Sequence, residues 1–259
     1  MKYDLVLSLG GSCAVANQLK VRGLRLFSLP FDWLYCTSYH SLEALAIAFK
    51  NDFVYWMVDQ NMEEMLASDY EKNAARFQYV DRLTGYRFIH DFSQPKEVIL
   101  HEVREKYQQR IHRLQEYLKC ADSIALCFDS NFSNCEVPLQ MLRRILLEKF
   151  GENKKIDCYW VEFAASSHAI TQKDAWNHYQ YTHAKPEYIF KEYPTFEFSF
   201  MDSFELTSKF KSENRMKGRF FYLVRTHKGV RLWLLRFARP KFEIKMFLGR
   251  KVFELKVGQ

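Results

Sequence analysis

The sequence predicts an α/β protein with three layers, in which helices cover both faces of a mostly parallel sheet, followed by a basic C-terminal extension. Short apolar runs alternate along the chain with longer stretches whose apolar residues recur every three or four positions, as they do in strands and amphipathic helices. Such alternation is typical of parallel strands joined by crossover helices. The first run also ends in a glycine pair before a helical pattern, which favours a strand–turn–helix start.

This first unit organises the rest of the chain. An apolar run over residues 4–9 ends in two glycines, and a helix is expected over Ala14–Val21. The glycines permit positive φ and a close approach of backbone or ligand. Ser12 suits the N-cap position, where its hydroxyl can accept a backbone N–H. Cys13 then lies in the first helical turn.

Cys13 is the candidate nucleophile of this turn. The N–H groups and the dipole at a helix N-terminus favour negative charge, which lowers the pKa of a thiol there and favours the thiolate. The N–H groups of Gly11, Ser12 and the first turn are candidate donors to a developing oxyanion. The alternative is a structural cysteine packed beside a tight turn.

In the next part of the chain, residues 26–92, the pattern predicts two strands and one or two helices. A short strand is expected within the run Leu26–Leu34, which a proline interrupts. Ser41 is expected to cap a helix, and residues 61–77 are polar with apolar residues at helical spacing. Tyr86–Phe92 is expected to be a buried strand with His90 near its C-terminal end. The apolar face of the capped helix comprises Leu42, Leu45, Ile47 and Phe49.

A long helix is expected next, because apolar residues recur at intervals of three and four positions over about six turns. These residues are Val103, Tyr107, Ile111, Leu114 and Leu118. Two more strands, Ser123–Phe128 and Ile156–Phe163, enclose a helix that begins near Pro138. Residues 166–200 lose this periodicity and are rich in aromatic side chains, so a packed, β-rich region is expected there.

A nucleophilic cysteine needs a base, and His90 is the histidine that the pattern places best. In an open α/β sheet the carboxyl ends of the strands face the functional crevice. Cys13 follows one strand and His90 lies near the end of another, so parallel pairing would bring both to one edge, within hydrogen-bond reach. The alternative for His90 is a histidine of the core.

A third group should orient the imidazole. Asp91 is adjacent to His90 in sequence but should point to the opposite face of the sheet. Asp129 and Asn131 end the third strand and are better placed, and Asp32 is a further option. The pattern does not choose among them.

Charge is distributed unevenly along the 259 residues. Residues 215–259 hold 13 of the 38 Lys and Arg but 2 of the 31 Asp and Glu, so this tail carries +11 against −4 for the rest. Bulky apolar residues alternate with its cations, which predicts contact with an anionic membrane surface; the alternative is a subdomain with a solvated basic face. No nucleic-acid-binding motif accompanies the charge. We expect a domain over residues 1–212 and a basic aromatic segment over 213–259.

The six cysteines show no CxxC pair and no regular spacing, which indicates reduced thiols instead of disulfides or a zinc site. No metal or cofactor is expected. No apolar run approaches the roughly 18 residues of a membrane span, and the start of the chain lacks the cleavage region of a signal peptide. We therefore expect a cytoplasmic protein, with the tail able to place it on the inner face of the membrane.

Four motifs occur in order along residues 1–163: SLGGSC (8–13), LFSLPFDW (26–33), FIHDF (88–92) and EKYQQRI (105–111). This order resembles a bacterial family of unknown function described as papain-like cysteine peptidases. The resemblance implies that Cys13 and His90 are the catalytic pair and that Pro30, Phe31 and Trp33 lie near them and contact substrate. The opening turn is also similar to that of some capsule-biosynthesis proteins proposed to be acyltransferases.

Together these observations favour an enzyme that transfers acyl groups through a thioester on Cys13, with His90 as general base. As a cysteine peptidase or related hydrolase, it would act on a peptide or a small molecule. An acyltransferase of surface-polysaccharide biosynthesis is an alternative, and would need a site for an acyl carrier on the basic face of the long helix or on the tail. A non-catalytic protein that binds a glycan or a nucleotide sugar is a third interpretation.

Overall fold

The computed structural model describes residues 1–36, 38–66, 76–131, 134–164, 169–173, 176–182, 196–210, 231–234, 242–248 and 251–257. The chain divides into two compact units, Met1–Ser208 and Lys209–Gln259. The predicted domain boundary after residue 212 falls outside the described residues and stays a prediction.

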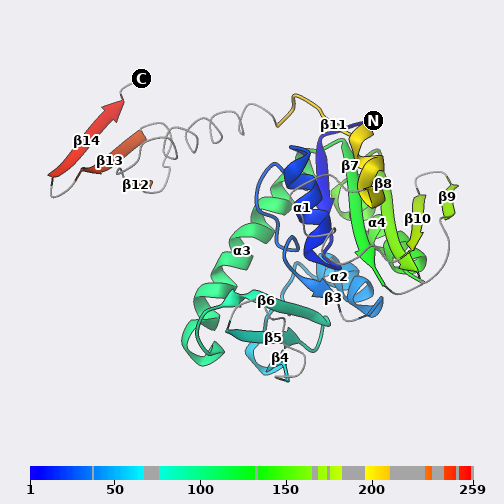
Figure 1. The fold of residues 1–259 in the computed structure, drawn as a ribbon, viewed down its shortest axis with the longest axis horizontal. Helices are drawn as coiled ribbons and strands as arrows, with labels where there is room; N and C mark the ends of the chain where they lie inside the picture. Colours follow the sequence, from blue (N-terminus) through cyan, green and yellow to red (C-terminus); the bar gives the residue numbers. More distant parts are fainter. Residues whose placement is uncertain are drawn as a thin grey trace. The chain divides into compact units, whose positions relative to one another are not determined.

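The first unit is built on a five-stranded, mostly parallel sheet (Figure 1). Four strands run parallel to one another, and one edge strand pairs antiparallel with its neighbour. The α/β class predicted from the sequence is therefore confirmed. In spatial order the strands are β2 (Leu5–Ser8), β7 (Ser123–Ser130), β8 (Lys155–Ala164), β10 (Trp176–Thr182) and the antiparallel β9 (Ala169–Lys173).

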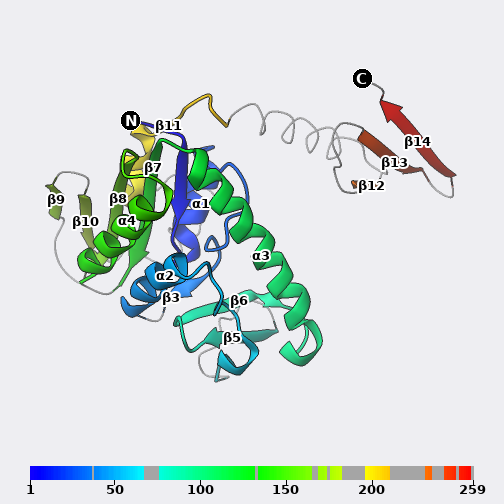
Figure 2. The same ribbon diagram turned by 180° about the vertical axis from the view of Figure 1, so that it is seen from behind.

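Helices cover both faces of this sheet (Figures 1 and 2). On one face, α1 (Cys13–Val21) and the 3₁₀ helix η3 (Phe196–Ser203) share an apolar core with the strands. On the other face lies α4 (Glu136–Phe150), which packs against α2 (His40–Lys50). The core on the α1 face includes Val6, Val15, Leu19, Cys127, Tyr159, Val161 and Phe198.

A second sheet of four antiparallel strands lies beside the first. Its order is β3 (Tyr35–Cys36), β6 (Tyr86–Phe92), β5 (Phe77–Asp81) and β4 (Met62–Glu64), which follows the short 3₁₀ helix η1 (Asp59–Asn61). The expectation that the strand carrying His90 pairs in the parallel sheet is therefore wrong: β6 pairs antiparallel on both sides. Its position is set by α3 (Lys96–Cys120), whose Tyr107 ring packs edge-on against Phe88 at 5.3 Å.

Several local predictions are confirmed, and four need correction. The stripe of α3 is buried at all five predicted positions, and β6 has the predicted bounds. No strand forms within Leu26–Leu34, because the Asp32 carboxylate accepts the Leu29 N–H at 2.8 Å and curls this segment into a turn. Helix α2 begins at His40, so Ser41 is a buried residue inside it and not its cap.

The other two corrections concern the surface of α2 and residues 62–64. Ile47, expected on the buried face of α2, is exposed. Residues 62–64 form β4 instead of a helix, because their backbone groups pair with β5, which overrides the local helical spacing. Within residues 166–200, where a β-rich region is expected, the described residues include strands β9 and β10.

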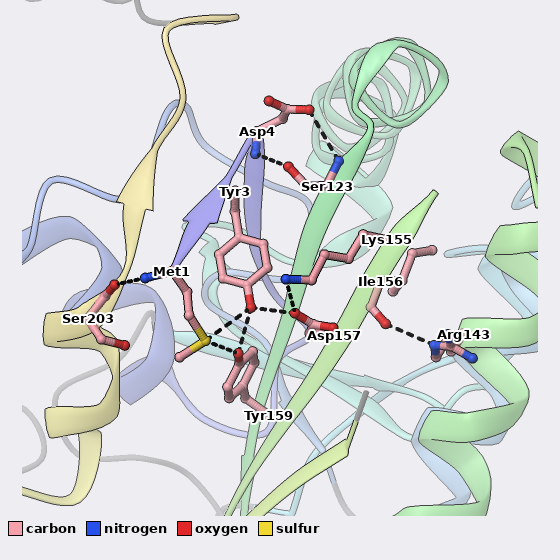
Figure 3. A network of polar contacts seen from close by, with 10 residues as sticks. All are labelled: Met1, Tyr3, Asp4, Ser123, Arg143, Lys155, Ile156, Asp157, Tyr159 and Ser203. Atoms are coloured by element: carbon pink, nitrogen blue, oxygen red, sulfur yellow. Dashed lines mark hydrogen bonds and ion pairs between the residues drawn. The ribbon is translucent and has the colours of Figure 1, made fainter. Parts of the chain in front are cut away.

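A polar network closes the amino end of the main sheet (Figure 3). The Tyr3 hydroxyl donates to Asp157 at 2.6 Å and lies 2.6 Å from the Tyr159 hydroxyl. The Asp4 carboxylate accepts the backbone N–H of Ser123 at 3.2 Å. Burial raises the pKa of Tyr3, so its phenol stays neutral. Strand β1 (Lys2–Tyr3) here pairs parallel with β11 (Glu205–Leu206).

In the second unit, the described backbone forms a three-stranded antiparallel sheet of β12 (Arg231–Leu234), β13 (Phe242–Leu248) and β14 (Lys251–Val257). The side chains that carry the predicted membrane contact lie outside what the structure describes. Among the described helices, none combines the length and apolar character needed to cross a membrane.

Candidate active site

The turn between β2 and α1 requires both of its glycines. Gly10 and Gly11 have φ values of +83° and +96°, where residues with a Cβ are strained. A Cβ on Gly11 would lie 2.0 Å from the backbone oxygen of Asp129, and one on Gly10 would lie 2.8 Å from the ring of Tyr86. The turn is therefore pressed between β7 of the main sheet and β6 of the second sheet.

Asp129 holds this turn in place. Its carboxylate accepts the Ser12 N–H at 3.0 Å and the Ser12 hydroxyl at 2.5 Å. Ser12 is the N-cap of α1, as predicted, and its Oγ accepts the Ala14 N–H at 3.0 Å. Burial raises the pKa of Asp129 to about 6, against the lowering effect of the hydrogen bonds from Ser12.

Cys13 and His90 come together at the start of α1. The Cys13 Sγ lies 3.5 Å from the His90 Nε2. The thiol is 6% exposed, whereas His90 is an exposed residue of β6 and not the buried one that the sequence predicts. The pair spans the two sheets, because Cys13 follows β2 and His90 lies on β6. The sequence predicts that Cys13 and His90 lie close together. They do so because β6 of the second sheet carries His90 to Cys13, and not because their strands are parallel neighbours in one sheet.

Within the described part of the chain, the His90 side chain contacts an aromatic ring and no carboxylate. The ring of Trp33 meets the imidazole edge-on, at 90° and 6.4 Å between centroids. The Asp91 carboxylate instead accepts the hydroxyl of Tyr107 at 2.9 Å and pairs with Lys106. The site is thus a Cys–His pair in which the histidine contacts the indole ring of Trp33.

The other three candidates for the group that orients His90 are Asp32, Asp129 and Asn131, and they lie elsewhere. Asp32 is fully buried and accepts Arg25 Nε at 2.8 Å, while Asp129 binds Ser12. Burial raises the pKa of Asp32, and the positive charge of Arg25 lowers it. Asn131 is exposed just after β7. None of these three side chains hydrogen-bonds to the His90 ring.

Of the segment expected to contact substrate, the structure brings Trp33 to the pair. Phe31 is buried among the rings of Phe49, Phe53, Trp56 and Tyr86. Pro30 is buried as well. That these two residues contact substrate stays a prediction, and Trp33 is the half-buried residue of the three.

The predicted oxyanion donors of this turn face other groups of the protein. The Ser12 N–H donates to Asp129, and the Gly11 backbone lowers the pKa of the Cys36 thiol, which burial raises overall. The Cys36 N–H in turn donates to the Gly11 carbonyl at 3.3 Å. These groups therefore serve to hold the turn, because the packing of β3 and β7 against it supplies their acceptors. What remains at Cys13 is the positive end of the α1 dipole.

Burial disfavours the charged form of four other thiols. Burial raises the pKa of Cys36 and Cys127, and raises that of Cys135 and Cys158 to about 12. Such thiols stay protonated near neutral pH and are poor nucleophiles. Cys13 is the one cysteine for which a histidine contact is found among the described residues.

A polar cluster that was not predicted from the sequence lies further along the carboxyl edge of the main sheet. The Glu162 Oε2 accepts Gln180 Nε2 at 2.7 Å and lies 2.9 Å from His178 Nε2. The His178 ring stacks on Trp160 at 3.8 Å, and Trp160 Nε1 donates to Ser130 Oγ at 3.0 Å. Alternation of 160 with 162 and of 178 with 180 would reveal the cluster if residues 176–182 were recognised as a strand. Within the described ranges, no group of side chains is arranged to hold a metal ion.

A buried thiol at a helix N-terminus, with a histidine nitrogen beside it, defines a candidate cysteine-nucleophile site on an α/β fold. The chain belongs to the family described as "putative papain-like cysteine peptidase" (DUF1796), whose model matches residues 4–141. The match includes Cys13, Trp33, His90 and Asp129. A search of curated proteins gave no match. A search of solved structures gave none either.

Proposed function

We propose that this protein is an acyl-transfer enzyme that uses Cys13 as nucleophile and His90 as general base. The observation that carries the proposal is the 3.5 Å separation of Sγ and Nε2. Each partner is suited to its role: the thiol lies at the positive end of α1, and the imidazole is open to solvent. Membership of the family supports the same chemistry.

The proposed reaction begins with transfer of the Cys13 proton to His90 Nε2. The thiolate then attacks the carbonyl carbon of an amide or ester, and the tetrahedral intermediate collapses as the imidazolium gives its proton to the leaving amine or alcohol. The product is a thioester on Cys13. In the second half, His90 takes a proton from the acceptor, whose oxygen attacks the thioester and restores the thiol.

The acyl acceptor determines whether the enzyme is a hydrolase or a transferase. Water gives a hydrolase or peptidase, and a hydroxyl of another molecule gives an acyltransferase. Both reactions share the thioester, so the same residues serve either. Because His90 is exposed, its ring can reach an acceptor from solvent.

The thioester provides the test. Incubation of the full chain with p-nitrophenyl acetate should release nitrophenol in a burst and add one acetyl group to the peptide that contains Cys13, as read by mass spectrometry. His90→Ala should slow acylation by about 10²- to 10⁴-fold, and Cys13→Ala should abolish it. Cys120→Ala, which changes an exposed thiol, is the matched control. Acetylation at an undiminished rate in Cys13→Ala would overturn the proposal.

A further inference from the structure

A group of arginines packed on aromatic rings is linked to the Cys13–His90 pair through Trp33 and is not used by the mechanism above. We call it the arginine–aromatic patch. It comprises the guanidiniums of Arg25, Arg110 and Arg113 and the rings of Phe27, Trp33 and Tyr107. All three arginines are half-buried, which separates them from the freely solvated cations elsewhere on the surface.

Arg25 connects the patch to His90 from the 25–33 loop. Its Cζ lies 5.4 Å from the centre of the Trp33 ring, the same ring that meets His90 edge-on. The guanidinium is held in place by Asp32, at 2.6 Å, and by the hydroxyl of Ser28, at 3.1 Å. Arg25 is thus a fixed cation connected to His90 by two successive ring contacts, through Trp33.

Helix α3 contributes the other two arginines. The Arg110 Cζ lies 5.4 Å from the centre of the Tyr107 ring, whose hydroxyl donates to Asp91, the residue after His90. Arg113 lies over Phe27 of the 25–33 loop at 5.8 Å. Arg110 also lowers the pKa of the Asp32 carboxyl through its charge, so the helix and the loop share one electrostatic environment.

The charges of this region do not cancel. Asp32 is paired with Arg25, and Asp91 is paired with Lys106. Arg110 and Arg113 have no carboxylate at ion-pair distance within the part of the chain that the structure describes. Stacking on a ring holds each guanidinium without using its N–H donors. The donors of both arginines therefore remain available to an added anion.

We infer that the arginine–aromatic patch binds an oxyanion group, a carboxylate or a phosphate, carried by the acyl donor that Cys13 attacks. Planar guanidiniums bind either group with two parallel hydrogen bonds. This inference rests on the proposed function and adds the substrate class to it: an anionic acyl compound, bound so that its charge lies toward α3 and its carbonyl toward Cys13.

Two alkylating probes of similar size, one neutral and one anionic, test the inference on the full chain. A Cys13 thiolate displaces iodide from neutral iodoacetamide or from anionic iodoacetate and forms a thioether in both cases. The rate for iodoacetate divided by that for iodoacetamide, normalised to a small free thiol, should exceed one in the wild type. It should fall at least threefold in R110Q/R113Q and with rising salt, because nearby cations concentrate the anion.

The controls separate charge from folding. R110K/R113K keeps both charges and should keep most of the ratio, and Lys119→Gln removes an exposed cation from the last turn of α3 and should leave it unchanged. An unchanged ratio in R110Q/R113Q, with rapid iodoacetamide labelling, would overturn the inference while leaving the proposed function intact. If iodoacetamide labels Cys13 no faster than Cys120, the proposed function itself fails.

Protection experiments then identify the anion. Inorganic phosphate and acetate are each titrated against iodoacetamide labelling of Cys13. Protection at lower phosphate concentrations indicates a phosphate-bearing donor, and protection at lower acetate concentrations indicates a carboxylate. Either protection should be lost in R110Q/R113Q, and protection by neither anion contradicts the inference.

Discussion

The carboxylate of Asp129 accepts both the backbone N–H and the hydroxyl of Ser12, at 3.0 and 2.5 Å, and so connects the carboxyl end of β7 to the N-cap of α1. From the sequence, Asp129 is one of several candidates for the group that orients His90. In the structure it positions the other half of the pair, because Ser12 directly precedes Cys13. The carboxyl is buried, and this burial gives it an unusual titration.

Asp129→Asn should flatten the dependence of stability on pH. Burial raises the pKa of Asp129 from 3.8 to about 6, so the folded state holds this proton more tightly than the unfolded state does. Its contribution to stability is full below pH 3.8 and is lost as the pH rises through about 6, a change on the order of 3 kcal/mol. Asparagine stays neutral and can still accept the Ser12 N–H.

Urea unfolding of wild type and Asp129→Asn between pH 4 and pH 7 measures this contribution. The variant should gain stability relative to the wild type as the pH rises across this range. A constant difference between the two proteins at all pH values would contradict the assignment of a raised pKa to Asp129.

Gly11→Ala should destabilise the fold and slow alkylation of Cys13. The new Cβ would lie 2.0 Å from the Asp129 oxygen at a φ of +96°, so the turn must move and carry Cys13 away from His90. We expect a loss of at least about 2 kcal/mol. Gly23→Ala is the matched control, because φ is +69° there but the Cβ meets no atom within 4 Å, and it should cost about 1 kcal/mol. Equal losses measured by thermal unfolding would argue against the close approach.

Trp33→Ala should reduce the acylation rate of Cys13 by about tenfold, because the indole edge fixes the orientation of the His90 ring. Trp33→Phe keeps a flat ring at this position and should restore most of the rate. The informative measurement is the pH profile of iodoacetamide labelling: a positioning role predicts a weaker pH-dependent rise in Trp33→Ala, with thermal stability close to that of the wild type. An unaltered profile would leave Trp33 as a packing residue only.

Glu162→Ala should destabilise the carboxyl edge of the main sheet by about 1 to 3 kcal/mol. The carboxylate is buried and serves both His178 and Gln180, so its removal leaves two side chains without their acceptor. Glu136→Ala, at an exposed position of α4, should change stability by less than about 0.5 kcal/mol. Denaturant unfolding of the two variants side by side provides the comparison, and similar losses would contradict the role of Glu162.

Local sequence patterns predict the elements that hold the site. The spacing of apolar residues identifies α3 and its buried stripe, and the glycine pair with Ser12 identifies the start of α1. These predictions succeed because helix periodicity, N-capping and positive φ depend on residues close together in the chain. The helical pattern near Met62 is overridden by pairing with β5, and the helix predicted near Ser41 forms but begins one residue earlier, at His40.

By itself, the sequence determined which reactive groups the site contains and the fold class around them: a cysteine at a helix N-terminus, a histidine on a strand, and alternating strands and helices. Only the tertiary structure decided how they meet, through a second antiparallel sheet that presents His90 to Cys13. It also assigned Asp129 to Ser12, Trp33 to His90 and Asp32 to Arg25. Some of these partners are far apart in the sequence, and others depend on how a loop packs. Which side chains pair at a site depends on their burial and on their distance in space. The spacing of residues along the chain gives neither quantity.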